Sequence, residues 1–156
     1  GRSAGAGESD GLMLLVVDTS VLVADLLRVR GRERLGHRRL DLCIPDHTLG
    51  EVQVELPRRI GALAASAGFD AGERDDLLVL CLDAVANNLA VVAAEVYSPF
   101  EEEARARSQR DLDDWPVVAC ALALSAAVWT NDNDFLGTGV PTWTTQTLQT
   151  WLDRLE

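Results

Sequence analysis

The amino-acid sequence predicts a three-layer α/β/α domain, in which a central, mainly parallel sheet is flanked by helices. Short apolar runs alternate with helical patterns along the chain, and this order is typical of a parallel sheet with helices on both faces. The length of 156 residues is that of one domain. No apolar run approaches the roughly 18 residues of a membrane span, so we expect no membrane association.

Several short segments have the apolar content of strands. Residues 12–17, LMLLVV, form a continuous run that suits a strand buried on both faces. Residues 89–93 indicate another buried strand, and Pro141 restricts the last strand to an edge of the sheet. The predicted strands cover residues 12–17, 41–44, 89–93, 127–130 and 141–144.

Helical periodicity separates these strands. Thr19 or Ser20 is a candidate N-cap for the first helix, and Asp46 or Thr48 for the helix that carries Glu51. Pro57 is expected to end or kink that second helix, because proline removes a backbone donor. The predicted helices cover residues 19–28, 46–57, 60–67, 70–87 (the clearest amphipathic pattern), a segment from Ser98, 114–126 and 145–155.

The net charge of −11 argues against simple binding to nucleic acid. Residues 28–39, expected to be a loop or a frayed helix end, nevertheless carry six arginines against one glutamate. This segment is either an RNA-guiding patch, a surface that an acidic partner covers, or a plain solvated loop. The chain contains no lysine and no G-x-G-x-x-G after its first strand, which excludes a Walker phosphate loop and a dinucleotide fingerprint.

Cysteine usage and the N-terminal segment indicate a cytoplasmic protein of one domain. Cys43, Cys81 and Cys120 have no paired spacing and are expected to be reduced core residues. Residues 1–10 are small and polar, without the apolar core of a signal peptide. We expect them to be a disordered tail or a remnant of an expression vector, and residues 11–156 to form the single domain.

Acidic side chains follow the predicted strands at the positions where parallel sheets bind ligands. Asp18 and Asp132 come directly after strands, and Glu51 and Asp114 lie near helix starts at the same edge. Converging carboxylates repel and raise one another's pKa. A hard divalent cation resolves that conflict, since Mg²⁺ and Mn²⁺ take oxygen ligands. Such a cation activates water and stabilises charge on a phosphodiester.

Together, VVDTSVL, the helix with Glu51, DDWPVVACALALSAAVWTNDNDF and GVPTWTT resemble the PIN-domain nucleases, in particular the VapC-type toxin ribonucleases of bacterial toxin–antitoxin systems. The resemblance extends from Leu12 over nearly all the remaining chain, and the block from Asp111 to Phe135 is its most specific part. It implies a divalent-metal-dependent endoribonuclease that cleaves single-stranded RNA with Mg²⁺ or Mn²⁺. It also implies a homodimer and an antitoxin protein as partner.

The resemblance assigns roles to particular residues. It implies a catalytic and metal-binding role for four acids and a second acid in the last loop, with three further candidates near the metal. The catalytic acids are Asp18, Glu51, Asp114 and Asp132, the additional metal ligand is Asp134, and the further candidates are Asp113, Ser20 and Thr130. Asp113 and Asp114 both remain open as the third ligand.

Structural alternatives exist for each of these residues. Asp18 could cap the first helix, and Glu51 could be a solvated helix residue. One of the two acids at 113 and 114 is expected to cap the helix whose first turn holds Pro116. Asp132 and Asp134 could be ordinary turn formers. The order and spacing of the whole set favour the functional interpretation.

Three arginines precede the third acid. Arg105, Arg107 and Arg110 either bind RNA phosphates, for which a guanidinium is well shaped, or form salt bridges with Glu101 to Glu103 at helical spacing. The four tryptophans lie in apolar contexts and are expected to be core or interface residues rather than stacking platforms.

Two other functions compete with a nuclease. One is a PIN-like module that binds RNA or protein with little or no turnover, although such a module would be expected to lose at least one acid. The other is a hydrolase of small phosphate esters. Asp18 is followed by Thr19 and Ser20, so the phosphoryl-accepting D-x-D pattern is missing and this second alternative is disfavoured.

Overall fold

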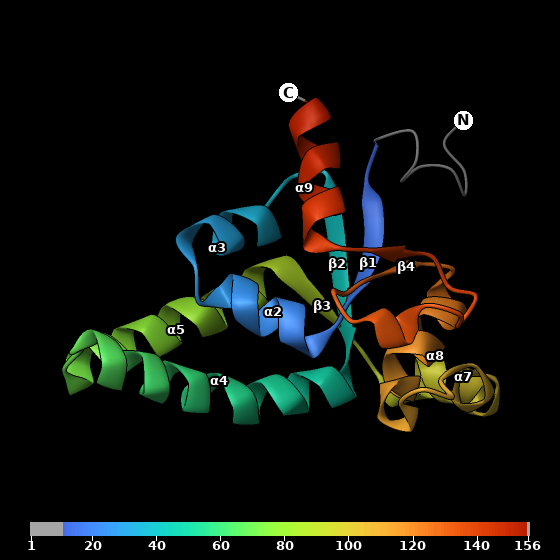
Figure 1. The fold of residues 1–156 in the computed structure, drawn as a ribbon, viewed down its shortest axis with the longest axis horizontal. Coiled ribbons are helices and arrows are strands. Elements are labelled where there is room, and N and C mark those ends of the chain that lie inside the picture. Colours follow the sequence, from blue (N-terminus) through green and yellow to red (C-terminus); the bar gives the residue numbers. More distant parts are fainter. Residues whose placement is uncertain (1–10, 156) are drawn as a thin grey trace.

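The computed structural model describes residues 11–155, so the tail predicted for residues 1–10 lies outside the described residues. A five-stranded, wholly parallel sheet forms the centre of the molecule, with strand order β3-β2-β1-β4-β5 (Figure 1). The strands are β1 (Met13–Val17), β2 (Leu40–Pro45), β3 (Leu89–Val92), β4 (Ala127–Trp129) and β5 (Thr142–Trp143).

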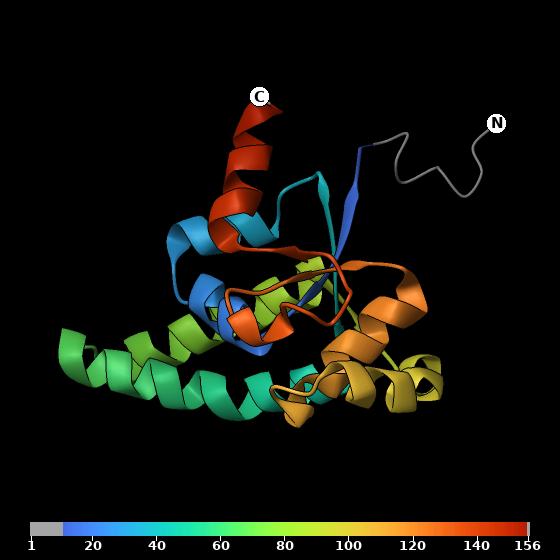
Figure 2. The same ribbon diagram turned by 45° about the vertical axis from the view of Figure 1, so that its right-hand side comes forward.

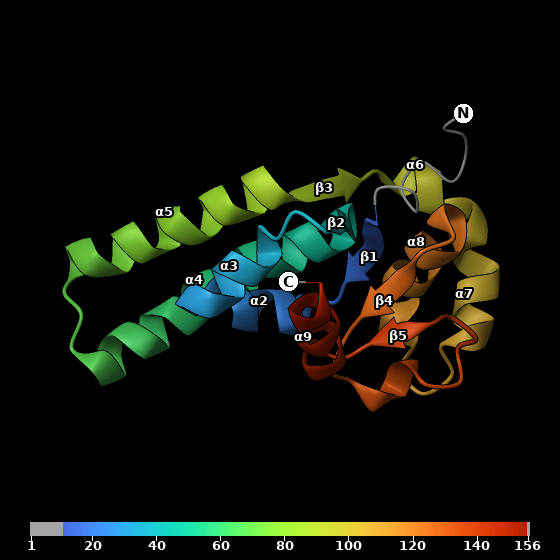
Figure 3. The same ribbon diagram turned by 90° about the horizontal axis from the view of Figure 1, so that it is seen from above.

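Helices surround this sheet, and α4 and α5 form a long hairpin that projects away from it (Figures 1 and 3). The α-helices are α2 (Thr19–Leu26), α3 (Val29–Leu35), α4 (Asp46–Ala67), α5 (Ala71–Asn88), α6 (Ala94–Tyr97), α7 (Glu101–Arg107), α8 (Trp115–Leu124) and α9 (Thr145–Arg154). Short 3₁₀ turns are η1 (Ser98–Phe100), η2 (Leu112–Asp114) and η3 (Asn133–Phe135).

The two faces of the sheet are covered by separate hydrophobic cores, which confirms the predicted three-layer architecture. In β1, Leu15 and Val17 point into the core beneath α2, α4, α5 and α9, and Val16 points into the core beneath α8. This alternation follows from the two-residue period of a strand. Figure 2 shows α2 and α8 on opposite sides of the sheet. The continuous apolar run of the first strand therefore reflects burial on both faces.

Residues 29–35 differ from the predicted loop or frayed helix end, because they form the helix α3. Leu35 is buried in the core and anchors the end of this helix. Gly31 allows α3 to approach the end of α2 closely, since a Cβ atom at this position would lie 2.2 Å from the carbonyl oxygen of Asp25. Tertiary packing therefore stabilises a helix in a segment that its charges and glycines did not favour.

Pro57 was expected to end or kink its helix; α4 does not end there but runs for 22 residues in all, from Asp46 to Ala67, and Gly68 follows as the predicted stop. Its buried stripe of Val52, Leu56, Ile60 and Ala64 repeats every four residues on both sides of the proline. Pro57 itself is exposed, so its ring faces solvent while the stripe stays in contact with the core.

The expected N-caps of α4 are also wrong. Pro45 occupies the N-cap position, and no side chain caps the helix. The carboxylate of Asp46 instead accepts hydrogen bonds from the backbone amide of Ala94 and from the hydroxyl of Tyr97. Asp46 therefore joins α4 to α6 rather than closing the first turn of α4.

The helix α5 and the strand β3 are less buried than predicted. Only Cys81 and Val85 are buried on α5, whereas Leu80 and Leu82 are 48% and 42% exposed. β3 forms one edge of the sheet, so that Val91 is exposed although the strand was expected to be buried. Apolar content alone does not show which strand lies at an edge, because that depends on how many neighbours pair with it.

Other expectations about the core are confirmed. The three cysteines at 43, 81 and 120 are buried and free. Trp129 is fully buried, Trp143 packs against Trp151, and Trp115 packs against Tyr97. β5, which begins after Pro141, lies at the other edge of the sheet. Over residues 11–155, no helix is both long and apolar enough to cross a membrane.

Candidate active site

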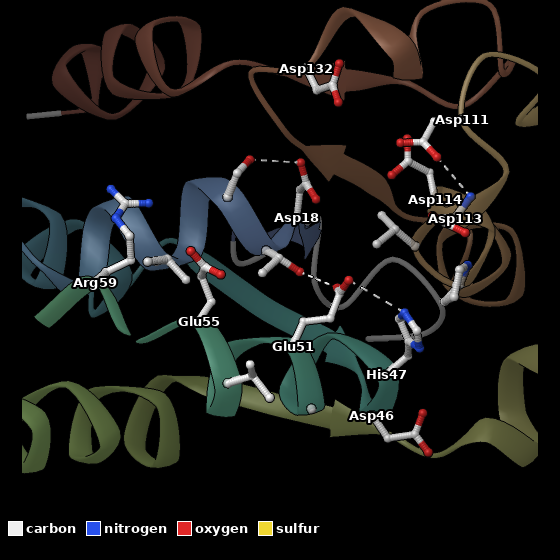
Figure 4. A pocket seen from close by; sticks show the side chains of 17 residues that line it. Asp18, Asp46, His47, Glu51, Glu55, Arg59, Asp111, Asp113, Asp114 and Asp132 are labelled. Atoms are coloured by element: carbon white, nitrogen blue, oxygen red, sulfur yellow. Dashed lines mark hydrogen bonds and ion pairs between the residues drawn. The ribbon is translucent and has the colours of Figure 1, made fainter. Parts of the chain in front are cut away.

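A cleft of about 890 Å³ opens at the carboxyl end of β1, and acidic side chains dominate its walls (Figure 4). All four acids predicted to be catalytic line this acidic cleft, although they come from separate parts of the chain. The lining carboxylates belong to Asp18, Asp46, Glu51, Glu55, Asp111, Asp113, Asp114 and Asp132. The fold therefore brings the predicted site together.

Asp18 lies at the junction of β1 and α2. It holds the N-cap position of α2, yet its side chain makes no capping hydrogen bond, so the capping alternative is wrong. Its Oδ2 atom accepts hydrogen bonds from the hydroxyls of Thr130 at 2.9 Å and Ser20 at 3.2 Å. Burial raises the pKa of Asp18 above its usual value, and the two hydroxyls partly offset this by stabilising the charged form.

Thr130 connects Asp18 to the second strand-end acid. The Thr130 side chain is 2% exposed, and its hydroxyl accepts a hydrogen bond from the backbone amide of Asp132 at 3.0 Å while donating to Asp18. One oxygen of Asp132 accepts from the amide of Asp134 at 2.9 Å and caps η3, as expected of a turn former. Asp134 does not line the cleft.

The acids before α8 have different roles from those expected. Neither Asp113 nor Asp114 caps this helix with its side chain; Asp111 instead caps η2 by accepting from the amide of Asp113. Within the described part of the chain, the buried Oδ2 atom of Asp114 has no hydrogen-bond partner. Burial, together with repulsion from the surrounding carboxylates, Asp111 and Asp18 foremost, raises the pKa of Asp114 to about 7.

Glu51 faces these acids from α4, on the other side of the cleft (Figure 4). One of its oxygens accepts a hydrogen bond from the hydroxyl of Thr19 at 2.6 Å, and the other lies 3.7 Å from Nε2 of His47. Its side chain is about half exposed. Glu51 is thus held toward α2 and is not a freely solvated helix residue.

Sequence reasoning missed three residues of the same wall. His47, Glu55 and Arg59 also line the cleft, and together with Glu51 they repeat every fourth position of α4. Residues at this spacing lie on one face of a helix, so the position of Glu51 could have identified them. Asp46 was missed as well, but it points away from the other acids and contacts Tyr97 (Figure 4).

Two of the three arginines near α7 form the salt bridges considered from their spacing. Arg105 pairs with Glu101 and Arg107 with Glu103, each at 2.7 Å. The guanidinium of Arg105 also stacks over Trp115, and that of Arg107 donates to the carbonyl of Thr138. Arg110 donates to the carbonyl of Asn133 in the loop that follows Asp132.

The family model described as PIN domain matches residues 16–153. The chain belongs to the PIN-domain family. PIN domains are generally nucleases, and these nucleases generally use divalent metal ions. Asp18, Glu51, Asp114 and Asp132 all lie within the residues that this match covers.

One solved structure with a similar fold is VapBC2 from Rickettsia felis, bound to a DNA fragment from its promoter. It matches with a TM-score of 0.58 and 14% sequence identity, over 85% of this chain and 98% of that one. At this identity the match shows a shared fold. A search of curated protein sequences finds no match to this PIN domain.

The donor set of the cleft fits a hard divalent cation. It offers carboxylate and hydroxyl oxygens, which Mg²⁺ and Mn²⁺ prefer, and one buried oxygen of Asp114 lacks a partner. Within residues 11–155, no three acidic, His or Cys side chains are grouped tightly enough to hold an ion as they stand. Side chains of the cleft would therefore have to move when a cation binds.

Proposed function

We propose that this PIN domain is a divalent-metal-dependent endoribonuclease that cleaves single-stranded RNA and serves as the toxin of a toxin–antitoxin pair. The observation that carries the proposal is the convergence of Asp18, Glu51, Asp114 and Asp132 on one cleft from four separate elements. Structural acids would be satisfied by caps and ion pairs, whereas Asp114 keeps a buried oxygen without a partner among the described residues.

In this proposal, Asp18, Asp114 and Asp132 hold Mg²⁺ or Mn²⁺, and Glu51 completes the site from α4. Asp134 is an additional acid whose charge acts on Asp114 from outside the cleft lining. Asp114 takes this role rather than Asp113, because it is Asp114 whose carboxylate oxygen is buried and unpaired. The cation, when bound, activates water and stabilises negative charge on the phosphodiester. Its charge also offsets the repulsion that raises the pKa of Asp114.

The chain's own residues prepare this site. Thr130 and Ser20 fix one oxygen of Asp18 through their hydroxyls and so orient this carboxylate in the wall of the cleft. Thr19 fixes Glu51 in the same way from the opposite wall. Glu51 is then placed to accept a proton from the attacking water, because it is partly exposed and faces the strand-end acids.

The partners belong to the same proposal. The fold likeness to VapBC2 supports an antitoxin protein as partner, and the resemblance to VapC-type toxins supports a homodimer. Either partner could bind an apolar surface, because the side chains of Leu80 and Leu82 on α5 and of Val91 on β3 are exposed. A cytoplasmic location follows from the same role.

A PIN-like binding module with little turnover is the alternative. The observation that favours it is the loose grouping of the acids. Within the described chain, no three of them lie close enough together to hold a metal ion. The two functions differ in a measurable way, since a binding module retains RNA without cutting it in any metal.

The test is cleavage of a labelled single-stranded RNA pool in Mg²⁺, Mn²⁺ or EDTA. We expect cutting that requires metal and that Asp18→Asn abolishes, because the variant removes ligand charge without changing side-chain shape. Asp83→Asn is the matched control, since Asp83 is exposed on α5 and lies outside the acidic cleft. RNA that is bound but never cut would favour the binding module, and equal cutting by the parent and Asp18→Asn would show that the site is wrong.

A further inference from the structure

Two further clefts continue from the acidic cleft along α2. Arg59 lines both the acidic cleft and a neighbouring cleft of about 420 Å³ between α2 and α4. Ala24 and Arg28 line that second cleft and also a third one, of about 730 Å³, beside the start of α9. Because they share these lining residues, the three clefts are neighbours along α2. We call the second and third clefts, with Arg59 at their entrance, the arginine groove.

The two arginines at the centre of this groove are available to a ligand. Arg28 and Arg59 are exposed, and within residues 11–155 their guanidinium groups form no ion pair or side-chain hydrogen bond, although the charge of Arg28 also acts on the nearby carboxyl of Asp25. Arg34, deeper in the third cleft, is different because it contacts Asp25 and Gln149. Arg105 and Arg107 are different as well, since both are paired with glutamates.

The charges of the two regions are opposite. Eight carboxylates and only one arginine, Arg59, line the acidic cleft, so a polyanion meets strong repulsion there unless metal is bound. The arginine groove begins at that same arginine and adds Arg28 and Arg34, against the single carboxylate of Asp25 among its described lining residues. Guanidinium groups match phosphate oxygens through paired donors, and they remain charged at any physiological pH.

The floor of the groove suits a nucleotide chain rather than a lone anion. Between the two arginines, the second cleft is lined by the apolar side chains of Ala24, Leu27, Ala62 and Leu63. An extended single strand presents charged phosphates on one side and the flat faces of its bases on another. Arginines at the rim of a groove complement the phosphates, and the aliphatic side chains between them provide an apolar surface for the faces of the bases.

We propose that Arg59 and Arg28 bind phosphates of single-stranded RNA outside the cleavage position, so that the strand leaves the acidic cleft along the groove between α2 and α4. This inference rests on the proposed nuclease function. It places the RNA path on the opposite side of the acidic cleft from Arg105, Arg107 and Arg110, the arginines that the sequence suggested (Figure 4 shows Arg59 and Asp111 at opposite ends of the cleft).

The experiment measures the salt dependence of binding between a fluorescent single-stranded RNA and the full chain in Mg²⁺, on an Asp18→Asn background that prevents cleavage. Each phosphate contact contributes about 0.7 to the slope of log K against log salt for single strands. We expect Arg28→Gln and Arg59→Gln each to reduce the slope by about 0.7, and the double variant by about twice that.

Arg38→Gln is the matched control. Arg38 is exposed, follows α3 and lines none of the three clefts, so its loss leaves the slope unchanged if the groove carries the strand. Equal reductions of the slope in all three single variants would mean that RNA binds a diffuse basic surface rather than the groove. Arg107→Gln serves as a second comparison and is expected to have no effect on the slope.

Other outcomes separate this inference from the function on which it rests. If the parent cuts RNA but Arg28→Gln and Arg59→Gln leave the slope unchanged, the groove is not the RNA path and the nuclease proposal stands. If the parent neither cuts nor binds RNA, both proposals fall. If the two variants lose binding to a polyglutamate peptide while RNA binding is unaffected, the groove receives an acidic protein segment instead.

Discussion

At the residue scale, the hydroxyl of Thr130 holds together two acids that are 114 positions apart in the chain. It donates to the side chain of Asp18 and accepts from the backbone of Asp132, and it is almost fully buried. Such outer partners orient metal-binding carboxylates, and their loss typically reduces metal affinity or activity by about 10- to 100-fold. Thr130 therefore acts as a positioning residue.

Thr130→Val tests this role. The variant keeps the shape of the side chain but removes both hydrogen bonds, so we expect Mn²⁺ affinity and the kcat/KM for RNA to fall by about 10- to 100-fold. Thr130→Ser keeps the hydroxyl and should restore most of both. If Thr130→Val loses thermal stability but binds Mn²⁺ like the parent, Thr130 has only a structural role.

The buried carboxyl of Asp25 makes the stability of the fold depend on pH. It is 4% exposed, and burial raises its pKa above the ordinary value of 3.8, with Arg34 and Arg28 opposing the shift. A carboxyl with a raised native pKa holds its proton more tightly in the folded state, so its contribution to stability is present below about pH 3.8 and is lost as pH rises through the native pKa.

Asp25→Asn removes this titration. We expect the stability of the variant, relative to the parent, to increase as pH rises from about 3.8. The midpoints of urea unfolding, measured for both proteins between about pH 3 and pH 7, report this difference in stability. A difference that stays constant or decreases over that range would mean that Arg34 dominates and that the native pKa of Asp25 is not raised.

The sequence predicted the members of the site better than their contacts. Asp18 and Asp132 could be identified because each directly follows a short apolar run, and parallel strands end at one edge. The capping roles could not be assigned, because the choice among Asp111, Asp113 and Asp114 depends on a 3₁₀ turn that precedes α8. Single-residue geometry of this kind does not follow from residue type.

At the element scale, α3 shows how packing overrides local preference. Its backbone lies so close to the end of α2 that only glycine fits at position 31. Gly31→Ala is expected to lower the free energy of unfolding by about 1–3 kcal/mol, since the methyl group would overlap the backbone of Asp25. Denaturant unfolding measures the change.

Gly61→Ala is the control for that substitution. Gly61 lies within α4 and an added Cβ atom meets no atom within 4 Å, so alanine should stabilise the helix by roughly 0.5–1 kcal/mol. Opposite signs for the two variants would confirm the close approach of α3 to α2. A stabilising effect of Gly31→Ala would contradict the position of α3.

The errors in predicting elements have a common physical origin. Pro57 was expected to interrupt α4, yet the stripe from Val52 to Ala64 keeps the helix against the core. β3 was expected to be buried, yet it pairs only with β2. Both outcomes depend on long-range packing, which a local pattern of residues does not contain.

At the scale of the whole molecule, the alternation of strands and helices was enough to predict the parallel sheet and its two helical layers. The order of the strands is what positions the site, because β1 and β4 are neighbours and end in Asp18 and the loop of Asp132. That order was not predicted from the sequence. It explains why a chain with a net charge of −11 gathers so many of its acids around one cleft.

Calorimetric titration of the protein with Mn²⁺ tests most directly whether these acids form one metal centre. We predict saturable binding by the parent and by Asp83→Asn, and loss of that binding in Asp132→Asn and Asp114→Asn. Binding of Mn²⁺ to Asp132→Asn and Asp114→Asn with the affinity of the parent would contradict the account, as would the absence of any Mn²⁺ binding by the parent.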